Sequence, residues 1–363
     1  MAQYQKLKAK VYLSDEGYGH IVRQRAVMTE IQRLAPDHQY TLQTHKHIDF
    51  ARQNTPAKNY INRYNNISWH KKEDSSPDTD RIQTHFKGYS QMVEEFMNEE
   101  RPAFNYDYVL SDFVYEAFNL AREKAVPSFG VSHFTWDWFF NKIYPRVITD
   151  HLFDYFTQAA NNATKLYFPP FTPSEILKHY QSKAVEVPFI VKEDVEHKQW
   201  PATDRLKVLI MDSGAGLMGM HIQQALNKSD KGEWCYGVQK SLGLNGSQFF
   251  NIPDGDLLID YVRDADLIVG RPGFNTLSEC IAYRKPMLLI SESMNPEMDY
   301  NIAELKKLRL GAFISLDDFC SRLDDALSAF LKYEFTMIDR AMQDHTFKTG
   351  GAHVIATDIL NSL

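Results

Sequence analysis

Two segments far apart in the chain share one pattern of apolar and polar positions. Each places a short apolar, β-branched run before a turn that contains glycine: KVYLSDEGYGH at residues 10–20 and KVLIMDSGAG at residues 207–216. The first continues into a helical pattern that puts Val27, Ile31 and Leu34 on one face. Strand, glycine turn and helix form the opening unit of a doubly wound α/β sheet. The repetition predicts an α/β protein with two Rossmann-like domains.

Further apolar runs have the length expected of strands. They lie at residues 39–44, 106–112 and 127–132 in the first half, and at 264–270 and 286–291 in the second. The helical stretch 113–126 separates two of them and has the length of an ordinary crossover. The polar segment 191–205, which contains Pro201, is the expected connection between the halves.

Length and charge narrow the choice of partners. At 363 residues the chain exceeds what one hydrophobic core commonly serves, which agrees with two domains. The formal net charge is −7 and no long basic run occurs, so the electrostatic signature of a nucleic-acid-binding protein is missing. We therefore expect no nucleic acid among the partners.

The cysteines and the first residues indicate a reducing compartment. Cys235, Cys280 and Cys320 share no metal-ligand spacing, and neither HExxH nor a Cys/His cluster occurs. The opening MAQYQKLKAKVYLS lacks the apolar region of a signal peptide and the length of a membrane helix. The sequence thus predicts a cytoplasmic protein without a metal site.

The segment GRPGFNTLSE, residues 270–279, carries the clearest chemical signal. A glycine turn after a strand, with a helix beginning near Asn275 and Thr276, offers backbone N–H groups and a helix N-terminus to an anion, and phosphate is the expected guest. In the alternative, the glycines only permit a tight turn, and Asn275 and Thr276 cap the helix. Glu279 would either close a capping box with Thr276 or accept hydrogen bonds from sugar hydroxyls.

Residues 253–301 resemble the donor-binding segment of glycosyltransferases of the GT-B fold, in which PQ..LL precedes H.G.NS..E and then DQ..N. The matching positions keep the spacing of that pattern: Pro253, Asp254, Leu257, Leu258, Arg271, Gly273, Asn275, Thr276, Glu279, Glu297, Met298 and Asn301. Arg271 at the start of the glycine segment is closer to the bacterial cell-wall N-acetylglucosaminyltransferases. The resemblance implies two domains that face each other across a cleft, and a nucleoside diphosphate sugar as donor, most commonly a UDP-sugar.

Two positions depart from the family pattern. Asp254 and Met298 replace two Gln residues that help to hold the base and the sugar in plant-type glycosyltransferases, which leaves base and sugar open. We expect the base pocket around Asp254 and Leu257. Glu297 would accept hydrogen bonds from sugar hydroxyls, or would be a surface carboxylate at a helix start. Arg271 would stabilise the charge of the departing diphosphate, or would form a structural ion pair.

The second glycine turn, residues 211–221, falls in the same expected donor domain. Gly214 and Gly216 would bring N–H groups to the diphosphate, with a plain strand-to-helix turn as the alternative. GT-B enzymes as a family need no bound metal, because helix N-termini and basic groups take the charge of the diphosphate. We therefore expect a metal-independent reaction without a cofactor, in which the nucleotide-sugar is a substrate.

The first half has a resemblance of its own. EGYGHIVRQ, residues 109–140 and VEVPFIV are similar to the glycosyltransferase-like N-terminal region of plant arabinokinases and of bacterial relatives that lack the kinase. The C-terminal GGAHVIATDIL resembles the last helix of the GT-B fold, which packs back on the first domain. These resemblances imply an acceptor domain at 1–195, joined by the helix 349–363, and a donor domain at 203–348.

His20 and Asp112 are the expected catalytic pair. His20 lies in the turn after the first strand and Asp112 ends a later parallel strand, so both reach the same edge of the sheet. A neutral imidazole can take the proton of the acceptor hydroxyl, while a carboxylate on its other nitrogen fixes the tautomer. Plant-type glycosyltransferases have a His and an Asp with these roles at matching positions. Alternatively, His20 caps a helix that begins at Ile21 or binds substrate, and Asp112 contacts an acceptor hydroxyl.

Residues 132–146 combine a histidine with several aromatic side chains. Core packing between the domains is the first interpretation of this segment. In the second, His133 and Trp136 line the acceptor site together with Gly17 and Gly19, because the segment follows a strand end. Weak contact with a membrane surface is the third.

The sequence as a whole predicts a metal-independent glycosyltransferase that moves a sugar from a nucleoside diphosphate sugar to an acceptor hydroxyl. A nucleotide-sugar hydrolase or epimerase of the same fold and a non-catalytic sugar-nucleotide-binding protein are the alternatives. The acceptor, the stereochemical outcome and the oligomeric state stay open.

Overall fold

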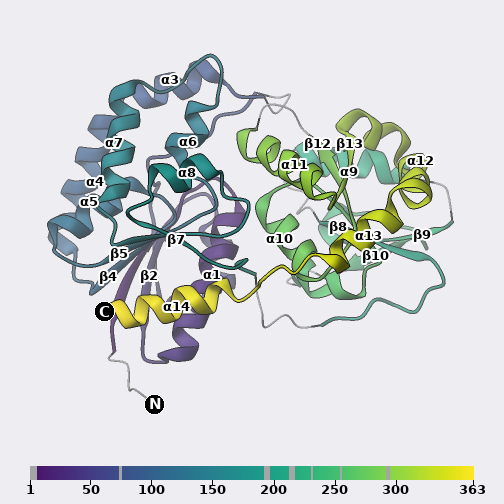
Figure 1. Ribbon diagram of the computed structural model, residues 1–363, viewed down its shortest axis with the longest axis horizontal. Coiled ribbons are helices and arrows are strands. Elements are labelled where there is room, and N and C mark those ends of the chain that lie inside the picture. Colours follow the sequence, from purple (N-terminus) through teal and green to yellow (C-terminus); the bar gives the residue numbers. More distant parts are fainter. Residues whose placement is uncertain are drawn as a thin grey trace. The chain divides into compact units, whose positions relative to one another are not determined.

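The structure is a computed structural model, in which the chain forms two compact units. It describes residues 6–72, 76–191, 197–211, 217–229, 232–253, 256–291 and 295–363. The first unit combines Met1–Val191 with Thr349–Leu363, and the second is Lys192–Lys348. The chain therefore builds most of the first unit, then the whole second unit, and ends in the first (Figure 1).

A seven-stranded parallel sheet with the order β3-β2-β1-β4-β5-β6-β7 forms the centre of the first unit. The order runs outward in both directions from β1 and β4, which is the doubly wound pattern with its switch point between these two strands. The strands are β1 (Lys8–Tyr12), β2 (Gln39–Thr44), β3 (Asn59–Asn62), β4 (Tyr108–Ser111), β5 (Ser128–Val131), β6 (Lys165–Phe168) and β7 (Ala184–Glu186).

Helices connect these strands and cover both faces of the sheet (Figure 1). They are α1 (Tyr18–Leu34), α2 (Ile48–Asn54), α3 (Thr79–Lys87), α4 (Tyr89–Ala103), α5 (Tyr115–Glu123), α6 (Trp136–Asn141), α7 (Asp150–Asn161), α8 (Ser174–His179) and, from the C-terminus, α14 (Gly351–Ser362).

The apolar runs of the first half are strands, as predicted. The run 39–44 is β2 in full, and the runs 106–112 and 127–132 contain β4 and β5. The stretch 113–126 contains the crossover helix α5. The sequence analysis did not predict β3, β6 and β7.

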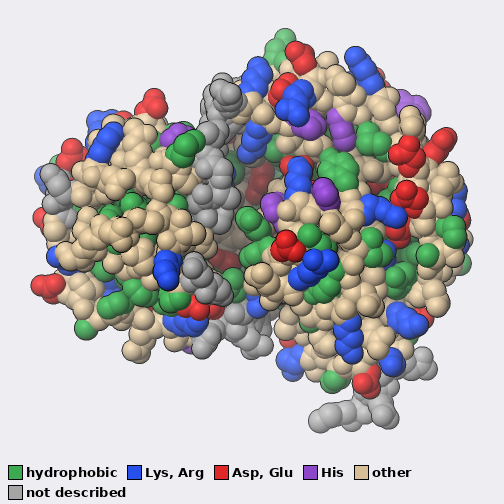
Figure 2. All heavy atoms as spheres, turned by 180° about the vertical axis from the view of Figure 1, so that it is seen from behind, with side chains coloured by type: hydrophobic (Ala, Val, Ile, Leu, Met, Phe, Trp, Pro, Cys, Tyr) green, Lys and Arg blue, Asp and Glu red, His purple; other side chains and the backbone are tan. Residues whose placement is uncertain are grey.

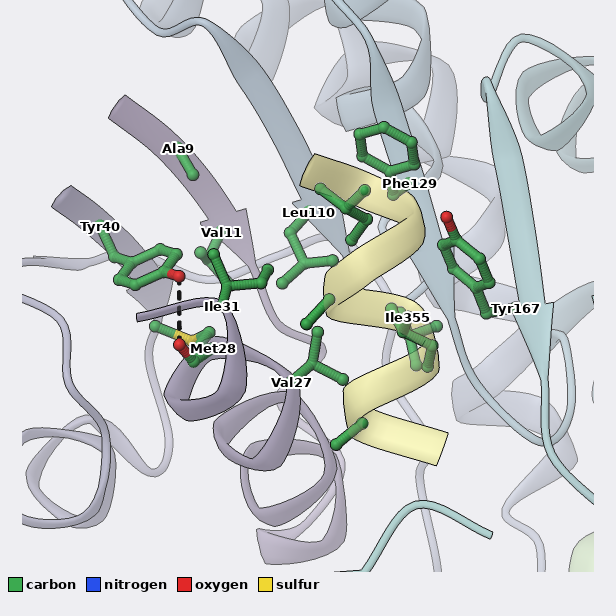
Figure 3. Packing of buried hydrophobic residues seen from close by; sticks show 14 of the residues in the cluster. Ala9, Val11, Val27, Met28, Ile31, Tyr40, Leu110, Phe129, Tyr167 and Ile355 are labelled. Carbon is green, nitrogen blue, oxygen red and sulfur yellow. Dashed lines mark hydrogen bonds between the residues drawn. The ribbon is translucent and has the colours of Figure 1, made fainter. Parts of the chain in front are cut away.

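One face of the sheet is covered by α1 and α14, whose apolar side chains share a core with the strands. In Figure 3, Val27 and Ile31 of α1, Leu110 of the sheet and Ile355 of α14 lie in this shared core. Leu34 packs against the same core while half-buried. The helical face predicted from the sequence is thus the face that α1 buries.

The position of α14 depends on a glycine at its first residue. The N–H of Gly351 donates to the carbonyl oxygen of Phe189 at 3.0 Å. A Cβ atom at position 351 would lie 2.1 Å from the carbonyl oxygen of Pro188, a distance that no side chain can adopt. The helix and the segment after β7 therefore come into backbone contact, which ties the C-terminal helix to the first unit.

The second unit repeats the same architecture with six parallel strands in the order β10-β9-β8-β11-β12-β13. Its strands are β8 (Leu206–Met211), β9 (Trp234–Gln239), β10 (Phe249–Ile252), β11 (Leu267–Gly270), β12 (Met287–Ser291) and β13 (Ala312–Ser315). Strands β8, β11 and β12 fall in the predicted runs. The repeated opening pattern of the sequence thus marks β1 and β8, which occupy equivalent places in the two sheets.

The helices of the second unit are α9 (Leu217–Asn227), α10 (Phe274–Ala282), α11 (Pro296–Leu308), α12 (Leu316–Tyr333) and α13 (Phe335–Asp344), with the short 3₁₀ segments η1 (Lys240–Leu242) and η2 (Leu258–Asp264). In neither unit does a described helix combine the length and the apolar character needed to cross a membrane. On the face shown in Figure 2, the described Lys, Arg, Asp and Glu side chains alternate without forming one continuous basic patch.

Candidate active site

The turn after β1 places His20 inside the first turn of α1. Gly17 is the N-cap of α1, and its φ of 131° is a conformation that side chains other than glycine rarely adopt. The helix begins at Tyr18, so His20 is its third residue and cannot be the cap of a helix that begins at Ile21. That alternative is wrong. Gly19 is the second helical residue, and Gly17 faces open space on its Cβ side.

Asp112 directly follows β4 and meets His20 across the switch point of the sheet. Its Oδ2 contacts Nδ1 of His20 and accepts a hydrogen bond from Oγ of Ser14 at 3.2 Å. Its Oδ1 accepts a hydrogen bond from Nη2 of Arg23 at 2.5 Å. The predicted pair is therefore formed, and both carboxylate oxygens have donors.

The charge state of Asp112 follows from these partners. Burial by itself would raise the pKa of Asp112, but His20 and the guanidinium of Arg23 together hold the pKa well below its usual range. An ionised carboxylate only accepts hydrogen bonds, so Nδ1 of His20 must carry the proton. Within the described residues no hydrogen bond occupies Nε2 of His20.

Arg23 is a member of this cluster that the sequence analysis missed. It lies three residues after His20 on α1 and therefore on the same face of the helix. Besides Asp112, it contacts Nδ1 of His133 at 3.1 Å and Oγ of Ser132 at 3.3 Å. The spacing HIVR after the glycine turn was the available signal, because an arginine in that place can reach the same strand ends as the histidine.

His133 and Trp136 follow β5 and both reach this cluster. The ring of Trp136 stacks on His20, with 5.8 Å between ring centroids and 22° between the planes. Trp136 is 3% exposed and His133 4% exposed, so most of their surface is used in packing. Trp138, Phe139 and Phe140 are buried as well, which supports core packing as the main role of the aromatic segment. Contact of His133 and Trp136 with an acceptor stays a prediction.

Asp15 is a second residue that the sequence analysis did not single out. Its Oδ1 accepts hydrogen bonds from Oγ1 of Thr44 at 2.9 Å and from the backbone N–H of His45 at 2.6 Å. Its Oδ2 accepts the N–H of Asn65 at 3.0 Å. Asp15 thus ties the turn before His20 to the loops that follow β2 and β3, so that three strand ends keep a fixed arrangement.

In the second unit, the glycine segment forms the predicted strand-turn-helix. Its N-cap is Gly273 and α10 begins at Phe274, one or two residues before the predicted start. The capping box is wrong, because Thr276 is the third residue inside the helix and therefore cannot cap it. Instead, Oε1 of Glu297 accepts a hydrogen bond from the backbone N–H of Phe274 at 3.1 Å.

The residues around the start of α10 differ in exposure. Gly273, Asn275 and Thr276 are half-buried, and no atom lies within 4 Å of the Cβ position at Gly273. Glu279 lies one turn further and is 7% exposed. The Cβ side of Gly273 is therefore open, whereas the side chain of Glu279 is buried.

Further contacts hold this turn in place. Nδ2 of Asn301 donates a hydrogen bond to the carbonyl oxygen of Pro272 at 2.9 Å. A Cβ atom at Gly270 would lie 3.0 Å from the carbonyl oxygen of Met211 in the neighbouring strand, so this glycine permits close strand contact. Gly270 therefore serves the tight packing of the strands, which is the alternative to phosphate binding. Gly273 has free space on its Cβ side.

The other residues predicted to bind the nucleotide-sugar donor belong to the second unit, and some of them lie outside the described residues. Arg271 is half-buried and directly follows β11, and Leu257 is half-buried at the N-cap of η2, a segment that packs against α10. Gly214, Gly216 and Asp254 lie outside the described residues. Among the described residues, no group of three or more His, Cys, Asp or Glu side chains could hold a metal ion.

Solved structures share this fold over nearly the whole chain. CalG4, the calicheamicin glycosyltransferase, is 14% identical with a TM-score of 0.63, covering 99% of this chain and 98% of its own. Arabidopsis thaliana UGT89C1 complexed with UDP is 12% identical with a TM-score of 0.62, covering 98% and 99%. The glycosyltransferase VinC in complex with DTDP is 13% identical with a TM-score of 0.58, covering 97% and 95%. No curated protein matches the chain.

Two doubly wound parallel sheets, matched by these structures, define the GT-B fold, which confirms the predicted fold class. A family model narrows the class further, since residues 10–332 match glycosyl transferase family 1. The chain belongs to glycosyl transferase family 1 and is a glycosyltransferase, as the sequence predicted. The resemblance to arabinokinases stays a prediction.

Proposed function

We propose that the protein transfers a sugar from a nucleoside diphosphate sugar, in the uridine form, to an acceptor hydroxyl without a metal ion. The observation that carries the proposal is the pair His20–Asp112, in which the carboxylate is fully bonded and the imidazole keeps Nε2 for a substrate. UDP in UGT89C1 and DTDP in VinC support a nucleoside diphosphate, and they make the thymidine form the alternative to be tested.

The first unit supplies the base. Nε2 of His20 takes the proton of the acceptor hydroxyl while the acceptor oxygen bonds to the anomeric carbon of the sugar. The bond between this carbon and the diphosphate oxygen breaks, and the diphosphate leaves with the electron pair. The proton stays on His20 as an imidazolium, which the ionised Asp112 stabilises through Nδ1.

The second unit supplies the charge that the leaving diphosphate needs. The N-terminus of α10 carries a partial positive charge, and the Cβ side of Gly273 leaves room for a phosphate beside it. Arg271 would face the same phosphates, and the carboxylates of Glu279 and Glu297 would accept hydrogen bonds from ribose and sugar hydroxyls. A site of this kind takes over the role of a divalent cation, so no cofactor is part of the proposal.

The experiment tests donor and reaction class together. The purified protein is incubated with a panel of UDP-sugars and dTDP-sugars, with and without EDTA, and with a panel of hydroxyl acceptors. Released nucleoside diphosphate, glycosylated acceptor, free sugar and isomerised donor are measured separately. We expect acceptor-dependent release of UDP that EDTA does not change. Free sugar without acceptor would indicate a hydrolase, isomerised donor an epimerase, and binding without any turnover a binding protein.

The state of the three cysteines supports a proposal about the cellular location of the protein. Cys235, Cys280 and Cys320 are all free thiols, and the first two are buried. Free cysteines without a disulfide framework are typical of a reducing compartment. We therefore retain the cytoplasm as the proposed location, and fluorescence microscopy of the tagged protein tests it.

A further inference from the structure

Arg23 contacts four polar side chains of the candidate catalytic cluster. It is 2% exposed and contacts Asp112 and Ser132 through Nη2 and His133 through Nη1. A guanidinium has N–H donors and no acceptor, and it stays protonated in proteins. An atom that accepts a hydrogen bond from Arg23 must therefore have a lone pair, which fixes the tautomer of a neutral histidine that accepts one.

This requirement gives the two histidines opposite tautomers. Nδ1 of His133 accepts from Nη1 of Arg23 at 3.1 Å, so the neutral ring of His133 carries its proton on Nε2. Nδ1 of His20 donates to Asp112, so the ring of His20 carries its proton on Nδ1. Nη2 of Arg23 and Nδ1 of His20 lie 3.2 Å apart. With this tautomer both atoms are donors, and both donate to the carboxylate of Asp112 and not to each other.

The same contacts keep the charges of the cluster in place. A protonated His133 would point an N–H at the N–H of Arg23 across 3.1 Å, so the arginine holds His133 neutral. Arg23 also occupies Oδ1 of Asp112 and leaves Oδ2 to His20 and Ser14. The carboxylate of Asp112 therefore cannot rotate away from His20 without losing its ion pair with Arg23.

We propose that Arg23 is a positioning residue of the acceptor-activating site, which fixes the tautomers of His20 and His133 and aims the carboxylate of Asp112 at His20. The inference goes beyond the proposed function and rests on it only in naming His20 as the base. It assigns His133 as a neutral Nε2–H donor and His20 as a neutral Nε2 acceptor in one cluster.

The direct test reads the tautomers in solution. Protein labelled with ¹⁵N-histidine is examined at neutral pH by long-range ¹H–¹⁵N correlation spectroscopy, with His20→Gln and His133→Gln used only to assign the signals. We expect a protonated Nδ1 in His20 and a protonated Nε2 in His133. Arg23→Met should turn His133 into a mixture of tautomers. A wild-type His133 with its proton on Nδ1 would overturn the proposal, whatever the variants do.

Kinetics separate positioning from a merely structural role. Arg23→Met should lower kcat by roughly tenfold to a hundredfold, a part of the 10²–10⁴ that positioned base catalysis supplies, with donor KM changed less than twofold. Arg23→Lys keeps a positive charge beside Asp112 but lacks the planar guanidinium group. Its kcat should therefore lie between those of Arg23→Met and the wild type. Arg33→Met is the matched control, because Arg33 is another arginine of α1 that is exposed and paired with Glu30. It should leave kcat within twofold.

The outcomes distinguish this inference from the proposed function. If the wild type transfers no sugar to any acceptor, the proposed function fails, and the tautomers alone decide the role of Arg23. If the wild type is active while Arg23→Met keeps both kcat and the tautomers of the wild type, the inference fails and the function stands. If Arg23→Met does not fold, the wild-type spectrum and the Arg23→Lys variant still decide.

Discussion

The two units share one strand order but arrange the polar groups at their strand ends differently. In the first unit, His20, Asp112 and Arg23 are almost fully buried and bonded to one another. In the second, the N-terminus of α10 is half-buried, has free space at Gly273, and donates the N–H of Phe274 to Glu297 of α11. The side chains of the first cluster hold one another in place. In the second unit, a ligand could replace Glu297 as the acceptor of the Phe274 N–H.

This difference matches two kinds of task. A base must present one nitrogen in one protonation state, and a closed network of charged hydrogen bonds fixes both. A site for a ligand that enters and leaves must have N–H groups that a phosphate can reach, with a protein carboxylate that can be displaced from them. The proposed function therefore assigns the fixed catalytic pair to the first unit and exchangeable ligand binding to the second.

The largest expected effect separates the two units directly. His20→Ala should lower turnover by roughly 10²- to 10⁴-fold, because the acceptor hydroxyl loses its base, and should leave the affinity for UDP nearly unchanged. Asp112→Asn should lose less, and the double variant should fall little below His20→Ala, because residues that act as a unit are not additive. Steady-state kinetics and calorimetry measure the two quantities. Near-wild-type turnover of His20→Ala, with the chemical step rate-limiting, would remove the pair from the mechanism.

The second prediction concerns a variant that should change nucleotide binding and leave the catalytic cluster unchanged. Glu279→Ala in the second unit should weaken UDP binding by roughly tenfold to a hundredfold, because a carboxylate that accepts hydroxyl hydrogen bonds contributes about 1.5–3 kcal/mol. The histidine tautomers of the first unit should stay as in the wild type. Unchanged affinity in a folded variant, measured by calorimetry, would place the ribose elsewhere.

The third prediction concerns the carboxylate already present at α10. Glu297→Gln keeps an oxygen for the N–H of Phe274 but removes a negative charge from the place where the diphosphate would bind. Affinity for UDP should rise by roughly threefold to fivefold, since two charges in contact in water repel by about 1 kcal/mol. Turnover of the UDP-sugar should fall, because a sugar hydroxyl loses a charged acceptor.

A charge elsewhere on the same helix provides the control for Glu297. Asp299 lies in the first turn of α11 and is exposed, so Asp299→Asn removes an equal charge at another place. Its UDP affinity should stay within twofold of the wild type. Lower affinity of Glu297→Gln for UDP would show that the carboxylate stabilises the turn and does not compete with the phosphate.

The sequence predicted the two sites unequally well. Apolar runs and glycine residues in the sequence indicate the strands β1, β4, β8 and β11 and the turns that follow them. His20, Asp112 and the start of α10 could therefore be located from the sequence. The spacing to His20 was the only local signal for Arg23, because its contacts with Ser132 and His133 join residues more than a hundred positions apart. Such contacts between strand ends are set by the order of the sheet, which local patterns do not contain.

The capping of α10 shows the same limit in the second unit. Thr276 and Glu279 have the spacing of a capping box, and only the start of the helix at Phe274 excludes it. The true partner of the Phe274 N–H, Glu297, comes from the next helix along the chain. Sequence spacing identifies groups that could cap a helix, while the tertiary structure decides which of them does.

The smallest expected effect lies on the surface of the first unit and contrasts with its buried cluster. Glu30 of α1 accepts hydrogen bonds from Nε of Arg33 at 2.8 Å and pairs with Nδ1 of His353 of α14 at 2.6 Å. The hydrogen bond from Arg33 is the main cause that lowers the pKa of Glu30 from 4.5 to about 2, against the opposing effect of burial and with a further contribution from His353. Because the folded pKa is depressed, the stabilisation is present above the unfolded pKa and is lost as the pH falls through about 2.

Both partners of Glu30 are more than half exposed, so solvent screening limits the effect. Glu30→Gln should lower the free energy of unfolding by about 0.5 kcal/mol at pH 7, and the difference from the wild type should shrink as the pH falls from about 4.5 toward 2. Urea unfolding followed by circular dichroism at a series of pH values measures this. A difference that stays constant down to pH 2 would mean that Glu30 acts by packing between α1 and α14 and not by its charge. Turnover at pH 7 should not change, because the closed cluster around Asp112 does not depend on this contact.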